Sequence, residues 1–324
     1  MLKNNILNDL INAEQTVSGQ RLADKYGVSR NAVWKAMNAL KAEGYVIEGT
    51  NNSGYTLLAK DVLSETQIIS DAEEYRKSHC DNARFTGFSV ICLDSVDSTS
   101  SEAKRRSFDA PCTVIAAKTQ TAGRGRMGRS FYSPDKTGAY FTVVLHGLRE
   151  LSSAVKVTSL AACAVCRAIE NLSPLKPAIK WVNDVYIDEK KVCGILTEAV
   201  SDMESGLVSD LLIGVGINVS TESFPPDIPL AGSLGISLSR SALIGAITCE
   251  ILKEMPYIAQ NRHIDYYRRH SLAIGRAVKF TENGITLSGV ADDVSDEGEL
   301  IVRLADGSVK RLSSGEITLR ITEY

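Results

Sequence analysis

The most informative stretch of the chain reads Gly123-Arg124-Gly125-Arg126-Met127-Gly128-Arg129 and lies between two apolar segments. Glycine lets a backbone approach a ligand closely, and arginine offers a fixed fork of donors for carboxylates and phosphates. A second stretch, Lys180-Trp181-Val182-Asn183-Asp184, places a cation, an indole, an amide and a carboxylate close together. The two stretches together predict an enzyme that handles a phosphorylated or adenylylated intermediate.

Length and composition indicate a globular protein of two or three domains. The chain has 324 residues, of which 44% are hydrophobic and 23% charged, and its net charge is −3. This charge excludes a globally basic nucleic-acid-binding protein, so any contact with nucleic acid must be local. No segment approaches the ~20 apolar residues of a membrane-spanning helix, and the N-terminus lacks a signal-peptide core. We therefore expect a cytoplasmic protein without a membrane partner.

The seven cysteines are scattered and mostly have apolar neighbours, as expected for reduced thiols in a core. Cys163 and Cys166 have the spacing of a metal or redox pair. No second pair or nearby histidine completes a zinc site, and alanine and valine surround both cysteines. We expect a buried helical turn here and no metal.

Residues 1–60 are predicted to form a winged helix-turn-helix domain. The expected elements are helices over residues 3–13, 19–26 and about 30–43 and strands over residues 44–48 and 55–58. Ser18 and Ser29 are predicted to cap the second and third helices, and Gly27 to end the second. The third helix should turn four apolar side chains inward, namely Val33, Trp34, Met37 and Leu40.

This third helix also offers polar side chains for the major groove of DNA: Ser29, Arg30, Asn31, Lys35 and Asn38. The alternative is a module that contacts protein, because residues 1–60 have only seven Lys or Arg against five Asp or Glu. So small an excess predicts weak binding by one domain, and hence a homodimer that engages two half-sites of an operator.

Residues 61–272 change to a mixed pattern of helices and strands. Strands are expected over residues 88–93, 113–117, 139–145, 178–181, 185–187, 191–199 and 211–218, and helices over residues 64–77, 101–106 and about 154–171. Several strands are joined by short turns, which favours a mixed or antiparallel sheet over a doubly wound one. Residues 273–324 read as short strands with Gly, Asp and Asn turns and predict a small SH3-like β-barrel. The fold class is therefore α+β in three domains.

Five motifs in the central region resemble the catalytic domain of biotin–protein ligases in residue identity, order and spacing. They are Asp97-Ser98-Thr99, the stretch 120–129, the stretch 180–184, Lys191-Val192-Cys193-Gly194-Ile195-Leu196 and Gly214-Val215-Gly216-Ile217-Asn218. With the N-terminal winged helix, the chain resembles the bifunctional class of this family, in which a ligase also represses biotin operons. The resemblance covers essentially the whole chain.

The resemblance implies that biotin and ATP react to give biotinyl-5′-adenylate, with Mg²⁺, and that biotin then passes to a lysine of a biotin carboxyl carrier protein. It assigns catalytic roles to Lys191, Arg126 and Asp184, and ties Asp184 either to Mg²⁺ or to orienting the attacking lysine. It assigns biotin contacts to Ser98, Thr99, Ser100, Gln120, Gly123, Arg124, Arg126, Gly128, Arg129, Lys191, Gly194 and Leu196. It assigns nucleotide contacts to Phe131, Asn183, Val215, Gly216, Ile217, Asn218 and Arg320.

Some residues keep a structural alternative. Lys191 could be a surface charge of a hairpin, Arg320 a surface charge of the barrel, the loop arginines a solvated face, and Trp181 core packing. The chain also departs from the usual family pattern at four positions, namely Ser100, Met127, Phe131 and Val182. None of these departures removes a charged reactant, so we expect activity to be retained.

Two rival functions remain at this stage. A lipoate–protein ligase shares the catalytic fold, but its glycine-rich signature differs and it usually lacks a winged helix. A transcription factor that only senses biotin or its adenylate would not need Lys191 and Asp184, which are both present.

Overall fold

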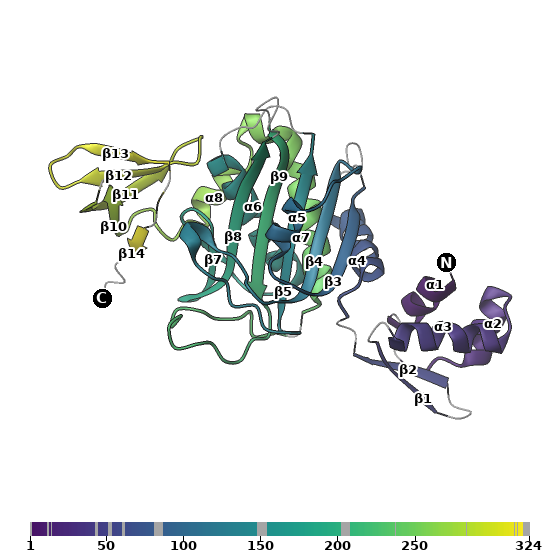
Figure 1. The fold of residues 1–324 in the computed structure, drawn as a ribbon. Coiled ribbons are helices and arrows are strands. Elements are labelled where there is room, and N and C mark those ends of the chain that lie inside the picture. Colours follow the sequence, from purple (N-terminus) through teal and green to yellow (C-terminus); the bar gives the residue numbers. More distant parts are fainter. Residues whose placement is uncertain are drawn as a thin grey trace.

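The computed structural model places three parts in a row, with the helices of the N-terminal part at one end, a seven-stranded sheet in the middle and a smaller sheet at the other end (Figure 1). It describes residues 2–11, 13, 15–42, 45–50, 54–59, 62–80, 87–147, 154–201, 208–236, 238–282, 284–313, 315 and 317–319. None of the helices in these ranges is long and apolar enough to cross a membrane.

The N-terminal part is the predicted winged helix. It contains α1 (Leu2–Ile11), α2 (Gly19–Tyr26), α3 (Arg30–Ala42), β1 (Val46–Thr50) and β2 (Gly54–Ala59), the two strands being antiparallel. Gly27 ends α2 in the left-handed conformation at φ 62°, which glycine adopts without strain. Ser29 caps α3, since its hydroxyl accepts from the Ala32 amide at 3.2 Å. Ser18 has an extended backbone before α2, but its side chain makes no capping bond.

One side chain of α3 lies outside the buried face that was predicted to include it. Val33, Met37 and Leu40 are buried, whereas 54% of Trp34 is exposed. The inward stripe follows a 3.6-residue period through Val33, Ala36, Met37 and Leu40, and Trp34 lies about 100° away from Val33 around the helix axis. The prediction that Trp34 points inward was wrong, because it rested on the apolar side chain and not on the position of Trp34 around the helix axis.

The central part is built on a mixed sheet, as predicted. Its strands are β3 (Ser89–Val96), β4 (Cys112–Gln120), β5 (Gly138–His146), β6 (Ala178–Lys180), β7 (Asp184–Ile187), β8 (Lys190–Ser201) and β9 (Val208–Asn218). They lie in the order β3-β4-β5-β9-β8-β7-β6. Only the β3–β4 pair is parallel among these described strands, and the other neighbours are antiparallel.

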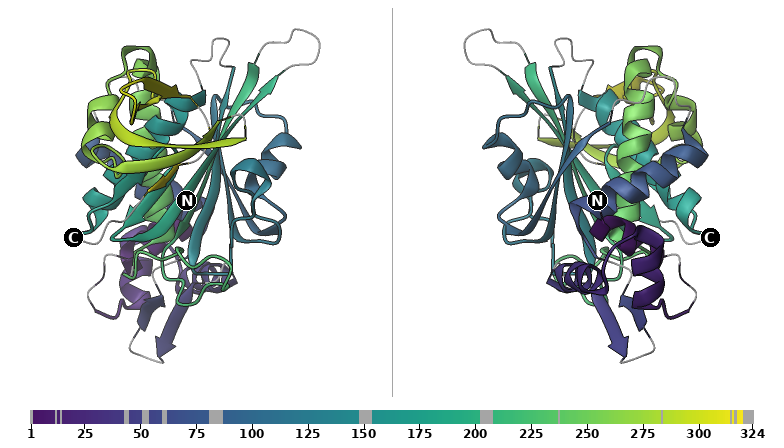
Figure 2. Two further views of the ribbon diagram at one scale, coloured as in Figure 1. Left: turned by 90° about the vertical axis from the view of Figure 1, so that its left-hand side faces the viewer. Right: turned by 90° about the vertical axis from the view of Figure 1, so that its right-hand side faces the viewer.

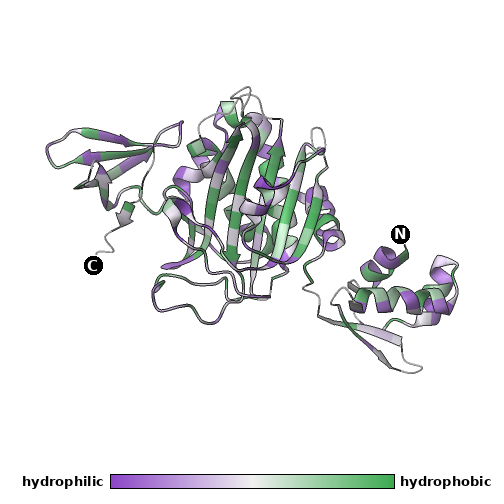
Figure 3. Ribbon diagram, viewed as in Figure 1, coloured by the Kyte–Doolittle hydropathy of each residue, from purple (hydrophilic) through white to green (hydrophobic). Residues whose placement is uncertain are grey.

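Helices cover both faces of this sheet. They are α4 (Glu65–His79), α5 (Thr99–Lys104), α6 (Ala154–Leu172), α7 (Arg240–Glu254) and α8 (Ile264–Arg269), with short 3₁₀ turns at Arg126–Gly128 and Met255–Gln260. The helices α4, α6 and α7 pack on one face in the main core, while α5 packs on the other face in a smaller cluster (Figure 2). The strands are accordingly coloured mostly as hydrophobic in Figure 3. No helix was predicted between residues 219 and 272, where α7 and α8 lie.

The cysteine pair of α6 belongs to this core. Cys163 and Cys166 are both fully buried, and burial raises the pKa of each thiol. The described residues contain no group of three or more histidine, cysteine or carboxylate side chains suited to a metal ion. The prediction of a buried helical turn is confirmed.

The C-terminal part is a five-stranded antiparallel sheet in the order β13-β12-β11-β10-β14. Its strands are β10 (Ala277–Glu282), β11 (Ile285–Val294), β12 (Leu300–Leu304), β13 (Val309–Leu312) and β14 (Ile317–Leu319). Trp181 ties it to the central part, because the buried indole donates to the Gly298 carbonyl at 2.9 Å. Trp181 is therefore a packing residue at the boundary between these two parts.

Candidate active site

A cleft of about 660 Å³ opens over strands β8 and β9, beside the end of β4. A wider lobe of about 2000 Å³ adjoins it, bounded by residues 224–231 and by Ile317 and Thr318 of β14. The cleft and the lobe share several residues, among them Phe131, Asn183, Asp184 and Lys191. These shared residues therefore lie where the contents of the two spaces would meet.

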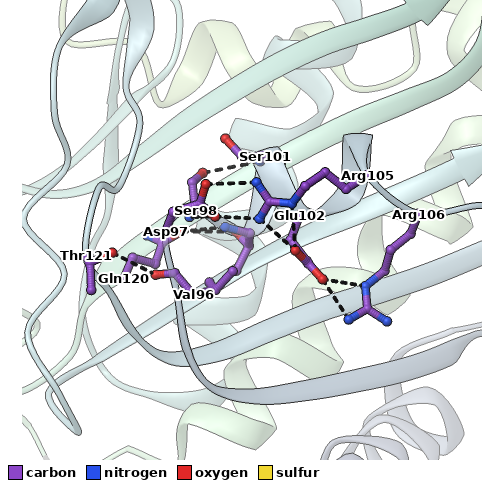
Figure 4. A network of polar contacts seen from close by, with 10 residues as sticks. Val96, Asp97, Ser98, Ser101, Glu102, Arg105, Arg106, Gln120 and Thr121 are labelled. Atoms are coloured by element: carbon purple, nitrogen blue, oxygen red, sulfur yellow. Dashed lines mark hydrogen bonds and ion pairs between the residues drawn. The ribbon is translucent and has the colours of Figure 1, made fainter.

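The start of α5 is anchored at one side of the cleft by a network of charged side chains (Figure 4). Arg105 donates to both carboxylate oxygens of Asp97, at 2.9 and 2.6 Å, and also to Glu102 at 2.7 Å. The Ser98 amide donates to Asp97 at 2.7 Å. The Arg105 guanidinium and this amide lower the pKa of Asp97 to about 2, so the carboxylate stays ionised and keeps this turn in place.

The floor of the cleft consists of the polar side chains Ser98, Thr99, Ser100 and Gln120. The first three are almost fully buried. Gln120 Oε1 accepts from the Thr99 amide at 2.9 Å and from the Thr99 hydroxyl at 3.2 Å. The floor is uncharged and internally hydrogen-bonded, which suits a neutral polar ligand group.

Three glycines in the neighbouring strands make room for the side chains of the cleft. A Cβ atom at Gly214 would lie 2.6 Å from the Ser100 hydroxyl, and one at Gly216 would lie 2.5 Å from the Phe131 ring. Gly194 pairs with Gly216 across β8 and β9, and a Cβ atom there would lie 3.3 Å from the same ring. Gly194 and Gly216 therefore leave room for the Phe131 ring to lie against the sheet, and Gly214 leaves room for Ser100.

The rim of the cleft carries four cations, Arg124, Arg126, Arg129 and Lys191. Lys191 Nζ lies 2.8 Å from Asp184 Oδ1. Arg126 donates to Asn183 Oδ1 at 3.1 Å, and Asn183 in turn donates to the Ile195 carbonyl at 3.0 Å. The side chains predicted to contact an anion are thus brought together from two stretches that lie far apart in the sequence.

The Gly/Arg stretch forms a tight hairpin beside the cleft. Arg124 pairs with Ser130, and the Gly125 amide donates to the Arg129 carbonyl at 2.7 Å. At the tip, Met127 has φ 55° and 75% of it is exposed. Met127 therefore points to solvent, and its departure from the family pattern does not change the lining of the cleft.

The lobe contains a buried acceptor that lacks a partner. Asn218 donates through Nδ2 to the Gly232 carbonyl at 2.9 Å. Its Oδ1 atom is buried without a hydrogen-bond partner among the described residues. An unpaired buried amide oxygen is costly, so this atom suits a ligand that brings an N–H donor.

The predicted site residues divide into three groups. Most line the cleft or the lobe: Ser98, Thr99, Ser100, Gln120, Gly123, Arg124, Arg126, Arg129, Phe131, Asn183, Asp184, Lys191, Gly194, Leu196, Val215, Gly216 and Asn218. Gly128 and Ile217 line neither space, and Ile217 is fully buried in the core. Arg320 lies outside the described residues.

Several residues around the cleft and the lobe were not predicted from the sequence. Segment 224–231 bounds the lobe, Gly214 backs Ser100, and the hydroxyls of Ser133 and Thr142 bond to floor residues. Serine and threonine on or near strands carry no sequence signal that separates them from ordinary β-sheet residues. Motif spacing alone did not identify them.

Comparison with protein families gives three matches along the chain. An HTH domain matches residues 3–56, the biotin/lipoate A/B protein ligase family matches residues 92–218, and the biotin protein ligase C-terminal domain matches residues 273–320. The bifunctional ligase/repressor BirA of Bacillus spizizenii is 31% identical over 319 residues, which covers 94% of each chain. The chain belongs to the bifunctional ligase/repressor family.

Other relatives of this ligase/repressor agree with that placement. The bifunctional ligase/repressor BirA of Escherichia coli is 26% identical and also covers 94% of both chains. A biotin protein ligase from Aquifex aeolicus, solved in complex with biotin and ATP, is 29% identical with a TM-score of 0.62. That structure matches 71% of this chain and 98% of its own length.

Proposed function

We propose that this ligase/repressor joins biotin to ATP and then transfers biotin to a lysine of a biotin carboxyl carrier protein. This proposal is supported chiefly by the position of Lys191, which lines both the cleft with the uncharged floor and the wider lobe. Biotin in the cleft and ATP in the lobe would bring the biotin carboxylate and the α-phosphate together beside this cation.

The reaction takes place in two steps. A carboxylate oxygen of biotin attacks the α-phosphorus of ATP, and the bond to pyrophosphate breaks to leave biotinyl-5′-adenylate. The amine of the acceptor lysine then attacks the acyl carbon, and AMP leaves. Lys191 and Arg126 are placed to stabilise the negative charge that gathers in the first step. Asn218 Oδ1, buried without a partner among the described residues, is suited to an N–H of the nucleotide.

The donor set also fits a magnesium ion. Asp184 is the one carboxylate among the described residues that line the cleft. Magnesium in phosphoryl-transfer sites is usually held by one or two carboxylates together with substrate phosphates. We propose that Asp184 holds Mg²⁺ when ATP is bound, where the ion would neutralise phosphate charge.

The test is incubation of the full chain with ATP, labelled biotin and an acceptor domain. We expect pyrophosphate release and label on the acceptor. Lipoate in place of biotin should give neither product. Transfer of labelled lipoate to the acceptor would favour the alternative function, a lipoate–protein ligase. Binding of biotin without pyrophosphate release would favour a sensor without ligase activity.

We further propose that α3 reads operator DNA and that two copies bind together. The predicted contacts Ser29, Arg30, Asn31, Lys35 and Asn38 are all exposed, and Trp34 lies among them on the same helical face. We add Trp34 as a contact, since an apolar side chain in the major groove suits a thymine methyl group.

The DNA-binding proposal is tested with the variant Arg30→Ala. Losing one cation from the groove should weaken operator binding and reduce the slope of log affinity against log salt by about one. Arg21→Ala, on the exposed part of α2, is the matched control. Equal effects of the two substitutions would contradict the assignment of α3. A 2:1 ratio of chain to operator by sedimentation would support the homodimer.

The domain boundaries are proposed at residues 60/61 and 272/273. Val62 packs in the N-terminal core, while Leu63 packs in the central core. The first boundary therefore lies close to this pair.

A further inference from the structure

Thr142 of β5 is fully buried and lies behind the floor of the cleft, out of contact with the cleft itself. We propose that Thr142 is a positioning residue that fixes the direction of the hydroxyl hydrogen bonds in the floor and so selects ligands with N–H donors. The inference rests on the proposed function, because it concerns how that site would choose biotin.

The direction of these bonds is set first at Gln120. The Thr99 amide has only a proton to offer, so the Gln120 atom 2.9 Å away must be the carbonyl oxygen Oε1. At the other end, Gln120 Nε2 donates to Ser133 Oγ at 2.8 Å, and Ser133 donates to the Phe131 carbonyl at 3.0 Å. Backbone groups at both ends therefore permit one orientation of the amide.

Each hydroxyl behind Gln120 then has one available role. The Thr99 hydroxyl donates its single proton to Gln120 Oε1 at 3.2 Å, so it accepts from Thr142 at 2.9 Å. Because Thr142 has used its proton on Thr99, the 3.1 Å contact between Ser100 and Thr142 requires Ser100 to donate. The protons run in one direction, from Ser100 through Thr142 and Thr99 to Gln120.

The consequence is that Thr99 and Ser100 can offer a ligand only oxygen lone pairs, since both hydroxyl protons are taken up by acceptors within the protein. The complement of two such acceptors is a rigid group with two N–H donors, as in a cyclic urea. A ligand with acceptors alone would set its own lone pairs against these oxygens, whereas N–H donors would pair with them, and a site built for donors discriminates strongly between the two. Gly214 supports this arrangement, because a Cβ atom there would lie 2.6 Å from Ser100 Oγ.

Two variants of the full chain separate this role from packing. Thr142→Val keeps the shape of the side chain and removes the hydroxyl, whereas Thr142→Ser keeps the hydroxyl and is the matched control. Calorimetry should show biotin binding about tenfold weaker in Thr142→Val, the value of one well-placed hydrogen bond, and restored within about threefold in Thr142→Ser.

Kinetics and an altered ligand sharpen the test. In Thr142→Val the KM for biotin should rise by the same factor, while kcat and the KM for ATP change little. The preference for biotin over a biotin methylated at both ureido nitrogens should narrow in Thr142→Val. Should that variant fail to fold in a urea-unfolding assay, Thr142→Ala takes its place.

The outcomes distinguish the inference from the proposed function. Unchanged biotin affinity in a folded hydroxyl-free variant overturns the role of Thr142, as does equal damage by Thr142→Ser. A wild-type chain that fails to bind biotin overturns the proposed function.

Discussion

The floor and the rim of the cleft differ in charge and in how their side chains are paired. The floor is neutral, almost fully buried at Ser98, Thr99 and Ser100, and linked by hydrogen bonds that run in one direction. On the rim, cations that we propose to bind the ligand are instead paired with protein groups, as Lys191 is with Asp184. The floor is thus already arranged for its ligand, whereas cations of the rim must exchange protein partners for ligand atoms.

This difference has a physical basis in exposure. The rim groups are partly exposed, with 47% of the Arg124 side chain and 33% of the Lys191 side chain accessible. Water that reaches these cations screens their ion pairs and weakens them relative to fully buried pairs, so a ligand anion can replace the protein partner. Once a ligand excludes water, the same cations stabilise a developing negative charge much more strongly.

The largest effect is expected from Lys191→Ala. Removing the rim cation at the junction of the cleft and the lobe should lower the rate of adenylate formation by about 10²–10³-fold, as for other preorganised charge-stabilising groups. Biotin affinity should fall much less, because the neutral floor is untouched. Pyrophosphate release and biotin titration measure the two quantities separately.

The control for that substitution is the neighbouring hairpin lysine. Lys190 is exposed and lines neither the cleft nor the lobe, so Lys190→Ala should leave both measurements nearly unchanged. If Lys191→Ala reduced affinity and rate equally, the division between floor and rim would be wrong.

The next effect concerns Phe131, which lies between the floor and the lobe. In Gly216→Ala the new methyl group would meet the ring at 2.5 Å and displace it. A displacement of about 1 Å in an active site costs up to 10²-fold, and we expect about a tenfold fall in kcat/KM for ATP. Gly194→Ala, whose nearest ring atom would lie 3.3 Å away, should have a smaller effect. A larger fall in kcat/KM for Gly194→Ala than for Gly216→Ala would show that the Phe131 ring does not lie against Gly216 as described.

Much of this architecture was predictable because its signals are local. The glycines and arginines of the stretch 123–129 indicated a ligand loop, and helical spacing located α1 to α3 within a few residues. Helix α7 was missed because it is buried along nearly its whole length, so its sequence lacks a polar face.

The remaining features depend on contacts between distant segments. The bond from Trp181 to Gly298 spans 117 residues, and the bond from Thr142 to Thr99 spans 43. No local pattern specifies such partners, and Thr142 reads as an ordinary β-strand residue until the fold places it behind Thr99.

A moderate effect is expected when ligands engage the rim. If Arg124, Arg126 and Arg129 exchange protein partners for an anion, the hairpin 123–129 should become better protected from trypsin. Biotin with ATP should slow cleavage at these arginines by several-fold, while biotin alone should slow it less. Equal cleavage with and without ligands would indicate that the rim is as fixed as the floor.

The smallest effect is expected from Tyr267→Phe, which tests whether the backbone beneath the rim stays still while its cations move. Tyr267 is fully buried in α8, and its hydroxyl donates to the Val182 carbonyl at 3.2 Å, next to Asn183 and Asp184. Burial raises the pKa of this phenol well above its usual value, so the proton remains available throughout the working pH range.

Loss of this one bond should lower the free energy of unfolding by about 1 kcal/mol, measured by urea denaturation. The rate of adenylate formation should fall by less than about threefold at every pH, because rim cations that exchange partners tolerate a small shift of the segment that carries Asn183 and Asp184. A fall as large as that of Lys191→Ala would mean that the positions of Asn183 and Asp184 are as critical as the charge itself. The rim would then be preorganised in the same sense as the floor.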